Sequence, residues 1–145
     1  MLTVNSIDVR ANLDKVFALA AEIEHWPERL PHYRWVRRIW QSGDTCVVEM
    51  AARRGWFPVK WISIQQLSKA NKRIYYKHTD GLTCGMWVEW AFIPFEDGVR
   101  VTITHEMNLS KPLIRSRLGK WIVAELFVKK IADNTLKHIK TLAEA

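Results

Sequence analysis

The pattern of hydrophobic and polar positions begins as a strand and turns into a helix. Leu2 to Arg10 alternate imperfectly between apolar and polar side chains, which predicts a first strand. Asn12 has a side chain suited to a helix N-cap. It precedes apolar residues at helical spacing, namely Val16, Phe17, Ala20, Ala21 and Ile23. Pro27 ends this helix, and a short second helix is expected from Pro27 to Leu30.

The period changes to two between His32 and Asn108. Turn-forming residues interrupt the alternation at five places, which are Gly43-Asp44, Arg54-Gly55, the region of Asn71, Asp80-Gly81 and Asp97-Gly98. Five turns separate six strands, so an antiparallel meander is predicted. The last strand is the clearest, because one face of it is apolar and carries Val99, Val101, Ile103, His105 and Met107.

The remainder of the chain predicts one long helix. Ser110 suits its N-cap and Pro112 its first turn. A stripe at alternating steps of three and four then comprises Leu118, Trp121, Glu125, Val128, Ala132, Thr135, Ile139 and Leu142. Roughly thirty helical residues reach about 45 Å, longer than any strand expected here, so the helix must lie across the sheet.

These elements define an α+β fold. A strand, two short helices, a six-stranded meander and a long helix give a seven-stranded antiparallel sheet with the helices on one face. Residues 1–145 have the length of one ordinary domain, which buries about two-thirds of the surface of the unfolded chain. A single domain must therefore carry the function.

The composition predicts a cavity and a positively charged surface. Hydrophobic residues make up 48% of the chain, and eight of the 145 residues are Trp, more large flat side chains than the packing of a small core requires. Some of them are expected to line a cavity. The formal net charge of +7 favours acidic partners, although the basic residues are dispersed and also fit an ordinary solvated surface.

Several classes of function find no support in the sequence. No apolar run is long enough to span a bilayer and no leader follows Met1, which predicts a soluble, cytoplasmic protein. Cys46 and Cys84 stand alone, and the five His have no metal-ligand spacing, so neither a zinc site nor a disulfide is expected. Phosphate-binding loops and the usual hydrolase motifs are missing from the sequence, and no cofactor is implied.

Three segments carry a family resemblance: IEHWPERLPHYRWVRR from Ile23 to Arg38, VEMAARRGWFPVKW from Val48 to Trp61, and GMWVEWAFIPFEDGVRVTITHEM from Gly85 to Met107. Together they resemble the START-like (SRPBCC) superfamily, and within it the polyketide cyclase/dehydrase group, which includes coenzyme-Q-binding proteins. The resemblance implies a helix-grip fold, like that of the birch pollen allergen, with a curved sheet wrapped around the C-terminal helix. It also implies a deep cavity for lipids, polyketides, quinones or other hydrophobic ligands.

The resemblance also implies particular pocket residues. Aromatase/cyclases of this superfamily have a Tyr near the start of the second strand, where this chain has Tyr33, and an Arg on the fourth strand. The corresponding position, counted from Trp61, falls at about Gln65. An amide hydrogen-bonds a carbonyl but supplies no positive charge to an enolate, so this departure counts against cyclase activity.

Aromatic residues are the main candidates for ligand contact. Trp26, Trp61, Trp90 and Trp121 come from a helix end, two strands and the long helix, and a helix-grip fold brings them toward one cavity. Packing of an ordinary core is the alternative for each. The other four are expected on the outer face, at strand edges or near the mouth, namely Trp35, Trp40, Trp56 and Trp87.

Polar residues on apolar faces are the candidates for chemistry. Glu125 lies on the helix stripe between Trp121 and Val128, where desolvation raises the pKa of a carboxyl group. His105 is expected to face the same space and, with Glu125, to shuttle a proton, with Tyr33 as the third candidate. Tyr76 and His78, which share a face of the fifth strand, are weaker candidates. A satisfied core histidine and a carboxylate at the cavity mouth are the structural alternatives.

Three functions remain open from the sequence. The first is a carrier or binding module for a hydrophobic molecule, which needs only the cavity. The second is a cyclase/aromatase or dehydratase acting on a polyketide-like chain that an acidic acyl carrier protein presents to the basic surface. The third, nucleic-acid binding by basic and Trp residues, is the least favoured, because the expected fold turns many Trp side chains inward.

Overall fold

The computed structural model describes residues 1–109 and 116–145 of the chain. Seven strands form one antiparallel sheet in the order β1-β7-β6-β5-β4-β3-β2, which confirms the predicted meander. The strands are β1 (Leu2–Val9), β2 (Tyr33–Ser42), β3 (Thr45–Arg54), β4 (Phe57–Ser68), β5 (Arg73–Gly81), β6 (Trp87–Phe95) and β7 (Gly98–Glu106).

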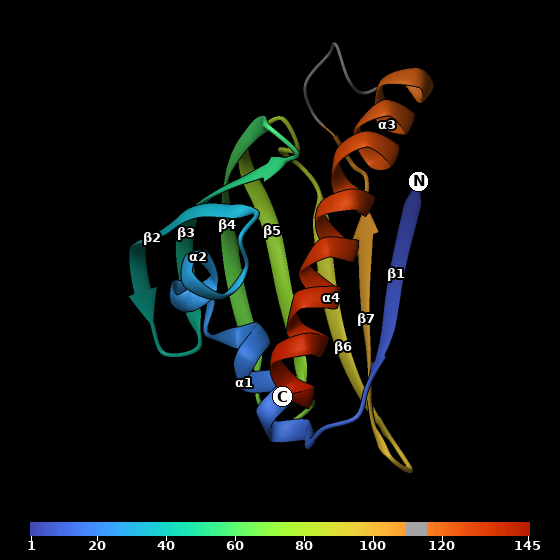
Figure 1. Cartoon of the computed structure of the whole chain (residues 1–145). Helices are drawn as coiled ribbons and strands as arrows, with labels where there is room; N and C mark the ends of the chain where they lie inside the picture. The colour runs from blue at the N-terminus through green and yellow to red at the C-terminus, as the bar shows by residue number, and fades with distance from the viewer. Residues whose placement is uncertain (110–115) are drawn as a thin grey trace.

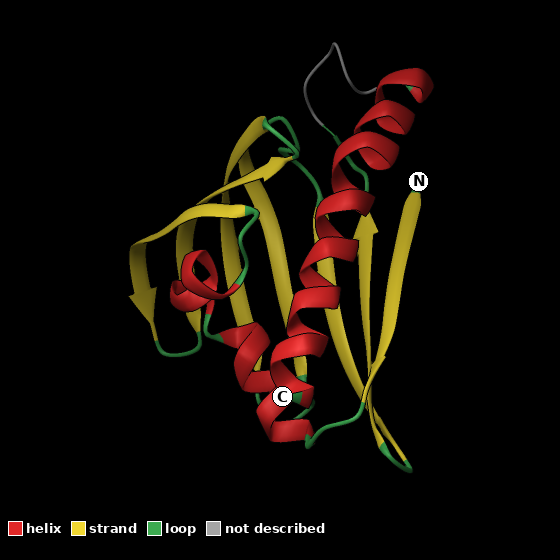
Figure 2. Cartoon of the chain, viewed as in Figure 1, coloured by secondary structure: helices red, strands yellow, loops and turns green. Residues whose placement is uncertain are grey.

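Helices connect and cover this sheet. The sheet has β1 and β2 at its opposite edges, and the link between them contains α1 (Leu13–Ala21), the 3-10 turn η1 (Ile23–His25) and α2 (Trp26–Arg29). The C-terminal helix consists of α3 (Arg117–Val123), the π-helical turn η2 (Ala124–Val128) and α4 (Lys129–Glu144). The helices lie on one face of the sheet, with the long helix crossing in front of the strands (Figures 1 and 2). The helix-grip α+β fold is thereby confirmed.

Local signals explain where most elements begin and end. The side chain of Asn12 accepts hydrogen bonds from the backbone N–H groups of Asp14 and Lys15, so it caps α1 as predicted. Each of the five turn signals falls at or beside an observed reversal of the meander. Ser110 and Pro112 lie outside the described residues. Within them, Ser116 caps α3 by accepting a hydrogen bond of 3.0 Å from the Gly119 N–H.

The sheet curves around the helix because two strands contain irregularities. The register shifts twice in the β2–β3 pairing, where Arg34 and Ile39 are extra residues of β2, and once in the β4–β5 pairing, where Thr79 is an extra residue of β5. An extra residue on one strand of an antiparallel pair bends that strand and increases its twist. The bent strands leave space between the sheet and α4, and this space contains the candidate site.

Strand β1 turns polar residues inward. Thr3 and Asn5 are buried while Leu2 and Val4 are exposed, the reverse of an ordinary amphipathic strand. The side chain of Asn5 donates a hydrogen bond of 2.7 Å to the carboxylate of Asp133 on α4. The amide nitrogen of Asn5 thereby avoids the desolvation cost of an unpaired polar group, whereas its buried Oδ1 has no hydrogen-bond partner among the described residues. This contact fixes the long helix against the edge of the sheet.

Candidate functional site

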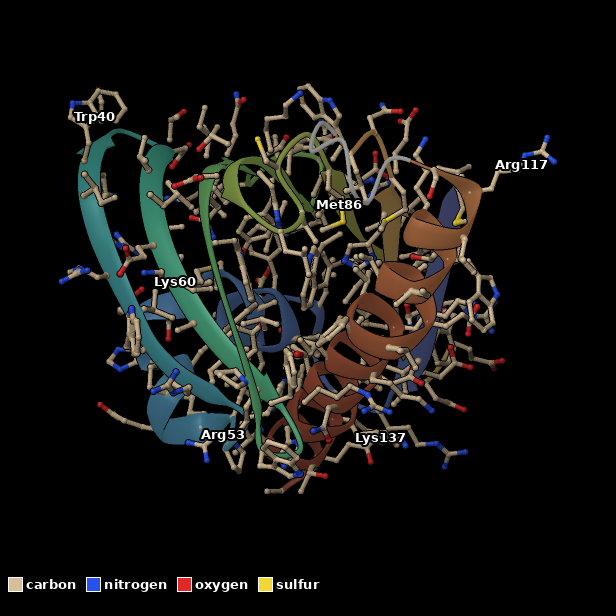
Figure 3. All side chains as sticks on the ribbon, turned by 90° about the horizontal axis from the view of Figure 1, so that it is seen from above. Trp40, Arg53, Lys60, Met86, Arg117 and Lys137 are labelled. Atoms are coloured by element: carbon tan, nitrogen blue, oxygen red, sulfur yellow. The ribbon has the colours of Figure 1, made fainter. Side chains whose placement is uncertain are left out.

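A cavity of about 90 Å³ lies between the sheet and the long helix. Its wall comes from α2, β2 to β7, the β5–β6 loop, η2 and α4. Figure 3 looks down on the curved strands and the helix that enclose it. Its lining comprises Trp26, Tyr33, Met50, Val59, Lys60, Trp61, Tyr76, His78, Leu82, Thr83, Met86, Val88, Trp90, Ile103, His105, Phe127, Val128, Ile131, Ala132 and Thr135. Exposed residues of this set, among them Lys60 and Leu82, place one end of the cavity at the molecular surface.

One wall of the cavity is a cluster of aromatic rings. The centroid of the Trp26 ring system lies 4.8 Å from that of Tyr33 and 5.9 Å from that of Trp90. Tyr33 in turn meets Trp61 at 6.2 Å, in an edge-to-face arrangement. Aromatic pairs favour such offset and perpendicular geometries. Since α2, β2, β4 and β6 each contribute one ring, only the folded chain forms this apolar wall.

Two buried histidines form the polar part of the lining. The ring of His78 stacks on Trp61, with centroids 5.6 Å apart and planes within 6° of parallel, and its Nδ1 lies 2.6 Å from the Thr83 hydroxyl oxygen. Burial, together with the nearby His105, lowers the pKa of His78 to about 3. Burial also lowers the pKa of His105 to about 4. Both imidazoles are therefore neutral at physiological pH.

His105 also has unused hydrogen-bonding capacity. Its side chain is buried, and its Nδ1 has no hydrogen-bond partner among the described residues. A buried polar atom without a partner loses its hydration without compensation. A hydroxyl or carbonyl group of a bound molecule would restore that hydrogen bond, with the imidazole nitrogen as acceptor or donor according to its tautomer.

Two phenols and an amide are further polar groups of the site, and none of them adds a charge. Burial raises the pKa of both Tyr33 and Tyr76, so both phenols keep their protons. Gln65 donates a hydrogen bond of 3.0 Å to the Tyr76 hydroxyl and accepts one of 3.3 Å from the Cys46 thiol. Gln65 therefore lies behind Tyr76 and holds its hydroxyl in place, rather than lining the cavity itself.

A third buried histidine, His32, lies beside the lining. Its Nε2 is 2.7 Å from the hydroxyl oxygen of Thr135, a cavity residue on α4. Burial and the neighbouring His138 lower the pKa of His32 to about 4. His32 thus connects the start of β2 to the long helix as a neutral group.

The structure brings seven of the sequence-predicted residues to the cavity, which are Trp26, Tyr33, Trp61, Tyr76, His78, Trp90 and His105. Their role in binding a ligand stays a prediction. Of the four Trp residues expected on the outer face, at strand edges or near the mouth, Trp40, Trp56 and Trp87 are exposed, whereas Trp35 is half-buried.

The prediction that Trp121 and Glu125 border the cavity is wrong. Trp121 is 52% exposed, and Glu125 accepts a hydrogen bond of 2.7 Å from Lys129 on the surface of the helix. The π-helical turn is the reason. It adds a residue to one turn, which rotates the preceding residues by about 100° relative to a regular helix. Val123 and Ala124 consequently face the sheet in their place.

The proposed His105–Glu125 proton shuttle is therefore not formed. Among the described residues, Glu125 is paired with Lys129, and no hydrogen bond or ion pair joins it to His105. His78 is the second histidine of the cavity lining, beside His105.

Sequence reasoning missed several residues of the lining. Met50 on β3 and Met86, directly before β6, have no chemistry that marks a site. Thr83 lies in the β5–β6 loop, and only the fold brings its hydroxyl to His78. Phe127 and Ile131, one helical turn apart, lie beside the predicted helix stripe rather than on it.

The described ranges 1–109 and 116–145 contain no group of three or more His, Cys, Asp or Glu arranged to hold a metal ion. Within the same ranges, no helix combines the length and the hydropathy needed to cross a membrane.

Solved structures share this architecture. The Thermus thermophilus protein TTHA0849 superposes with a TM-score of 0.83 at 19% identity, covering 97% of this chain and 95% of that protein. The Zhui aromatase/cyclase from Streptomyces sp. R1128 gives 0.84 at 16% identity, over 99% and 93%. Major latex-like protein 151 from Panax ginseng gives 0.80 at 8% identity, over 100% and 98%. At these identities, the likeness establishes the fold alone.

The fold and its enclosed cavity define a helix-grip protein of the START-like class. The family model described as "Polyketide cyclase / dehydrase and lipid transport" matches residues 9–131. The chain belongs to this family. No curated protein sequence gives a significant match.

Proposed function

We propose that this protein binds a hydrophobic small molecule, such as a lipid, polyketide, quinone or other aromatic metabolite, in the cavity between the sheet and the long helix. The convergence of Trp26, Tyr33, Trp61 and Trp90 on one cavity carries this proposal. Ligand sites are typically concave and apolar, with a few placed polar groups. The description of the family, which names lipid transport and polyketide cyclases, supports the same class of ligand.

The polar lining favours an uncharged ligand. His78 and His105 are neutral, both tyrosines keep their protons, and Gln65 replaces the Arg of the related cyclases. A buried anion or cation would find no opposite charge among these five groups to offset its desolvation, and the Lys60 ammonium of the lining lies in the exposed part of the cavity. A hydroxyl or carbonyl group, by contrast, matches the unpartnered Nδ1 of His105.

The volume of the cavity indicates that the ligand is small or flat, or that the cavity widens when the ligand binds. About 90 Å³ is well below the roughly 300 Å³ at which pockets for drug-sized ligands begin. The exposed residues at the open end are those that can move most freely. Uncharged aromatic probes of increasing ring number distinguish a fixed cavity, which rejects the larger probes, from one that expands.

Native mass spectrometry of the purified protein tests the proposal. We expect a co-purifying hydrophobic molecule, or saturable binding of an uncharged aromatic probe such as 1-naphthol. Ala132→Phe places a ring in the cavity from α4 and should abolish binding, whereas Ala70→Phe, at the exposed β4–β5 turn, should not. Val128→Phe is a second variant that fills the cavity. Circular dichroism verifies that the variants fold. Equal binding by the blocked and control variants would overturn the proposal.

A cyclase/aromatase or dehydratase is the second candidate, because two imidazoles and the Tyr33 phenol share the cavity. The low pKa values weaken it: a base with a pKa of about 4 is roughly a thousandfold weaker than one near 7. An acidic acyl carrier protein would present the substrate in this case. His105→Ala and Tyr33→Phe test it with a carrier-bound polyketide-like chain, since an enzyme loses turnover in both variants while a carrier shows none in any.

A further inference from the structure

Large apolar side chains are exposed at one end of the molecule. At the tip of the β3–β4 hairpin, Trp56 is 90% exposed and Phe57 is 50% exposed. On the C-terminal helix, Leu118 is 67% exposed and Trp121 is 52% exposed. The hairpin and α3 lie at the same end of the molecule, at the top of Figure 1. We refer to the exposed apolar residues of the hairpin, α3 and η2 as the mouth patch, which comprises Trp56, Phe57, Leu118, Trp121, Ile122 and Leu126.

The mouth patch borders the open end of the cavity. The ring of Phe57 lies 5.3 Å from that of Phe127, which is itself a lining residue. The β5–β6 loop lies at the same end and contributes the partly exposed Leu82 to the lining. A hydrophobic molecule that leaves the cavity here meets apolar side chains before it meets water.

The helical half of the patch is one continuous face. Leu118, Ile122 and Leu126 follow one another at steps of four residues, and Trp121 lies three residues after Leu118, so these side chains are neighbours on the helix surface. The opposite face, with Val123 and Ala124, packs inward. The π-helical turn that displaced Trp121 from the cavity therefore turns it outward into this patch.

Unneutralised positive charge surrounds the same end. Arg53 and Arg54 flank the hairpin tip, while Arg117 and Lys120 belong to α3, and none of these four forms an ion pair with a described carboxylate. Figure 3 looks onto this end and shows Arg117 extending into solvent. Elsewhere several cations pair with carboxylates, as in Lys69–Asp44, Lys72–Asp14, Arg100–Asp8 and Lys140–Glu144, whereas others, such as Arg73 and Lys137, form no ion pair with a described carboxylate.

We propose that the mouth patch docks the protein on the surface of an anionic lipid bilayer. Trp side chains favour the membrane interface, and Lys and Arg beside them are attracted to anionic headgroups. A helix with an apolar face that includes Trp and Leu, flanked by basic residues, is typical of interfacial binding. An acidic protein is the alternative partner, since positive charge alone would attract it. Such a partner would leave the protruding Trp56 unexplained. Two copies of the patch would bring their unpaired cations together, which disfavours self-association through this face.

Docking in this orientation opens the cavity toward the bilayer. If the proposed ligand is a lipid or quinone, it passes between membrane and cavity without crossing water, and this consequence rests on the proposed function. The docking itself does not, because vesicle binding is measured without any ligand. Failure of one proposal is therefore distinguishable from failure of the other.

Vesicle co-sedimentation tests the proposal with the full chain. We expect binding to vesicles of equal parts phosphatidylcholine and phosphatidylserine, little binding to phosphatidylcholine alone, and weaker binding as salt increases. Trp56→Ser combined with Trp121→Ser should reduce binding about tenfold or more. Trp40→Ser, on β2 and about as exposed as Trp121, should leave it unchanged.

Substitutions of basic residues measure how much the positive charge contributes to vesicle binding. Arg53→Gln combined with Arg54→Gln should weaken binding about tenfold or more, since each basic residue near an anionic surface contributes separately. Lys69→Gln combined with Lys137→Gln removes the same charge elsewhere and should have little effect. No sedimentation with either vesicle, or equal losses in both charge pairs, would overturn the proposal. So would a dimer, seen by analytical ultracentrifugation, that Trp121→Ser dissociates.

Discussion

Three buried histidines make the stability of the folded chain sensitive to mild acid. His32, His78 and His105 are each at most 8% exposed, and folding lowers their pKa values from 6.5 to about 4, about 3 and about 4, respectively. In the folded state all three stay neutral at about pH 5, whereas in the unfolded chain all three take up a proton. Acid therefore stabilises the unfolded chain selectively.

The sign and size of the effect follow from proton linkage. Because the unfolded chain binds more protons, the free energy of unfolding rises with pH; the full stability is present above pH 6.5 and is lost as the pH falls toward the folded-state values. Between about pH 7 and about pH 5, each histidine contributes a loss of about 2 kcal/mol. The three together give roughly 5 to 6 kcal/mol, which is comparable with the total stability of many domains.

Urea denaturation at a series of pH values measures this loss. His78→Gln should reduce the pH slope of the unfolding free energy by about 1.4 kcal/mol per pH unit below the unfolded-state pKa, because one proton is removed from the linkage. His25→Gln is the matched control, since this side chain is 45% exposed, and it should leave the slope unchanged. A stability that stays constant between about pH 7 and about pH 5 would refute the reasoning.

Three substitutions test the fold by differential scanning calorimetry or urea denaturation. Asn12→Ala removes the cap of α1 and should cost about 1 kcal/mol; no change would mean that backbone or water replaces the cap. Gly81→Ala should cost about 1 to 3 kcal/mol, because φ is +100° and an added Cβ would lie 2.6 Å from the Lys60 carbonyl oxygen; a stabilised variant would contradict this geometry. Phe92→Ala should cost about 3 to 5 kcal/mol, since Phe92 is 1% exposed and packs edge-to-face on Phe17; a loss below about 1 kcal/mol would contradict its burial.

The meander was predictable because its signals are local. Each turn contains Gly, Asp or Asn where the chain reverses, and alternation between the turns fixes which side chains share a face. That alternation also predicted that Tyr76 and His78 face the same way and that His105 faces inward, as the structure has them. The distance between the two histidines depends on how the strands pair and curve, which no local signal contains.

Local sequence signals do not predict which face of β1 is buried, nor which residues at the start of the long helix face the sheet. Thr3 and Asn5 point inward because Asn5 finds a partner on α4, more than a hundred residues away. Trp121 points outward because one π-helical turn rotates the residues before it relative to the rest of the helix. From Val128 onward the helix is regular, and the residues predicted to face the sheet are buried or half-buried. A single inserted residue suffices to move a predicted site residue to the surface.

Binding in the cavity is the central claim, and the indole N–H resonances of the Trp residues test it most directly. Two-dimensional ¹H–¹⁵N NMR with 1-naphthol should shift the indole signals of Trp26, Trp61 and Trp90, whose rings line or close the cavity. The signals of Trp40 and Trp87, which are exposed elsewhere, should stay in place. Shifts confined to these two outer residues, or no shifts with uncharged aromatic probes of any size, would contradict the account.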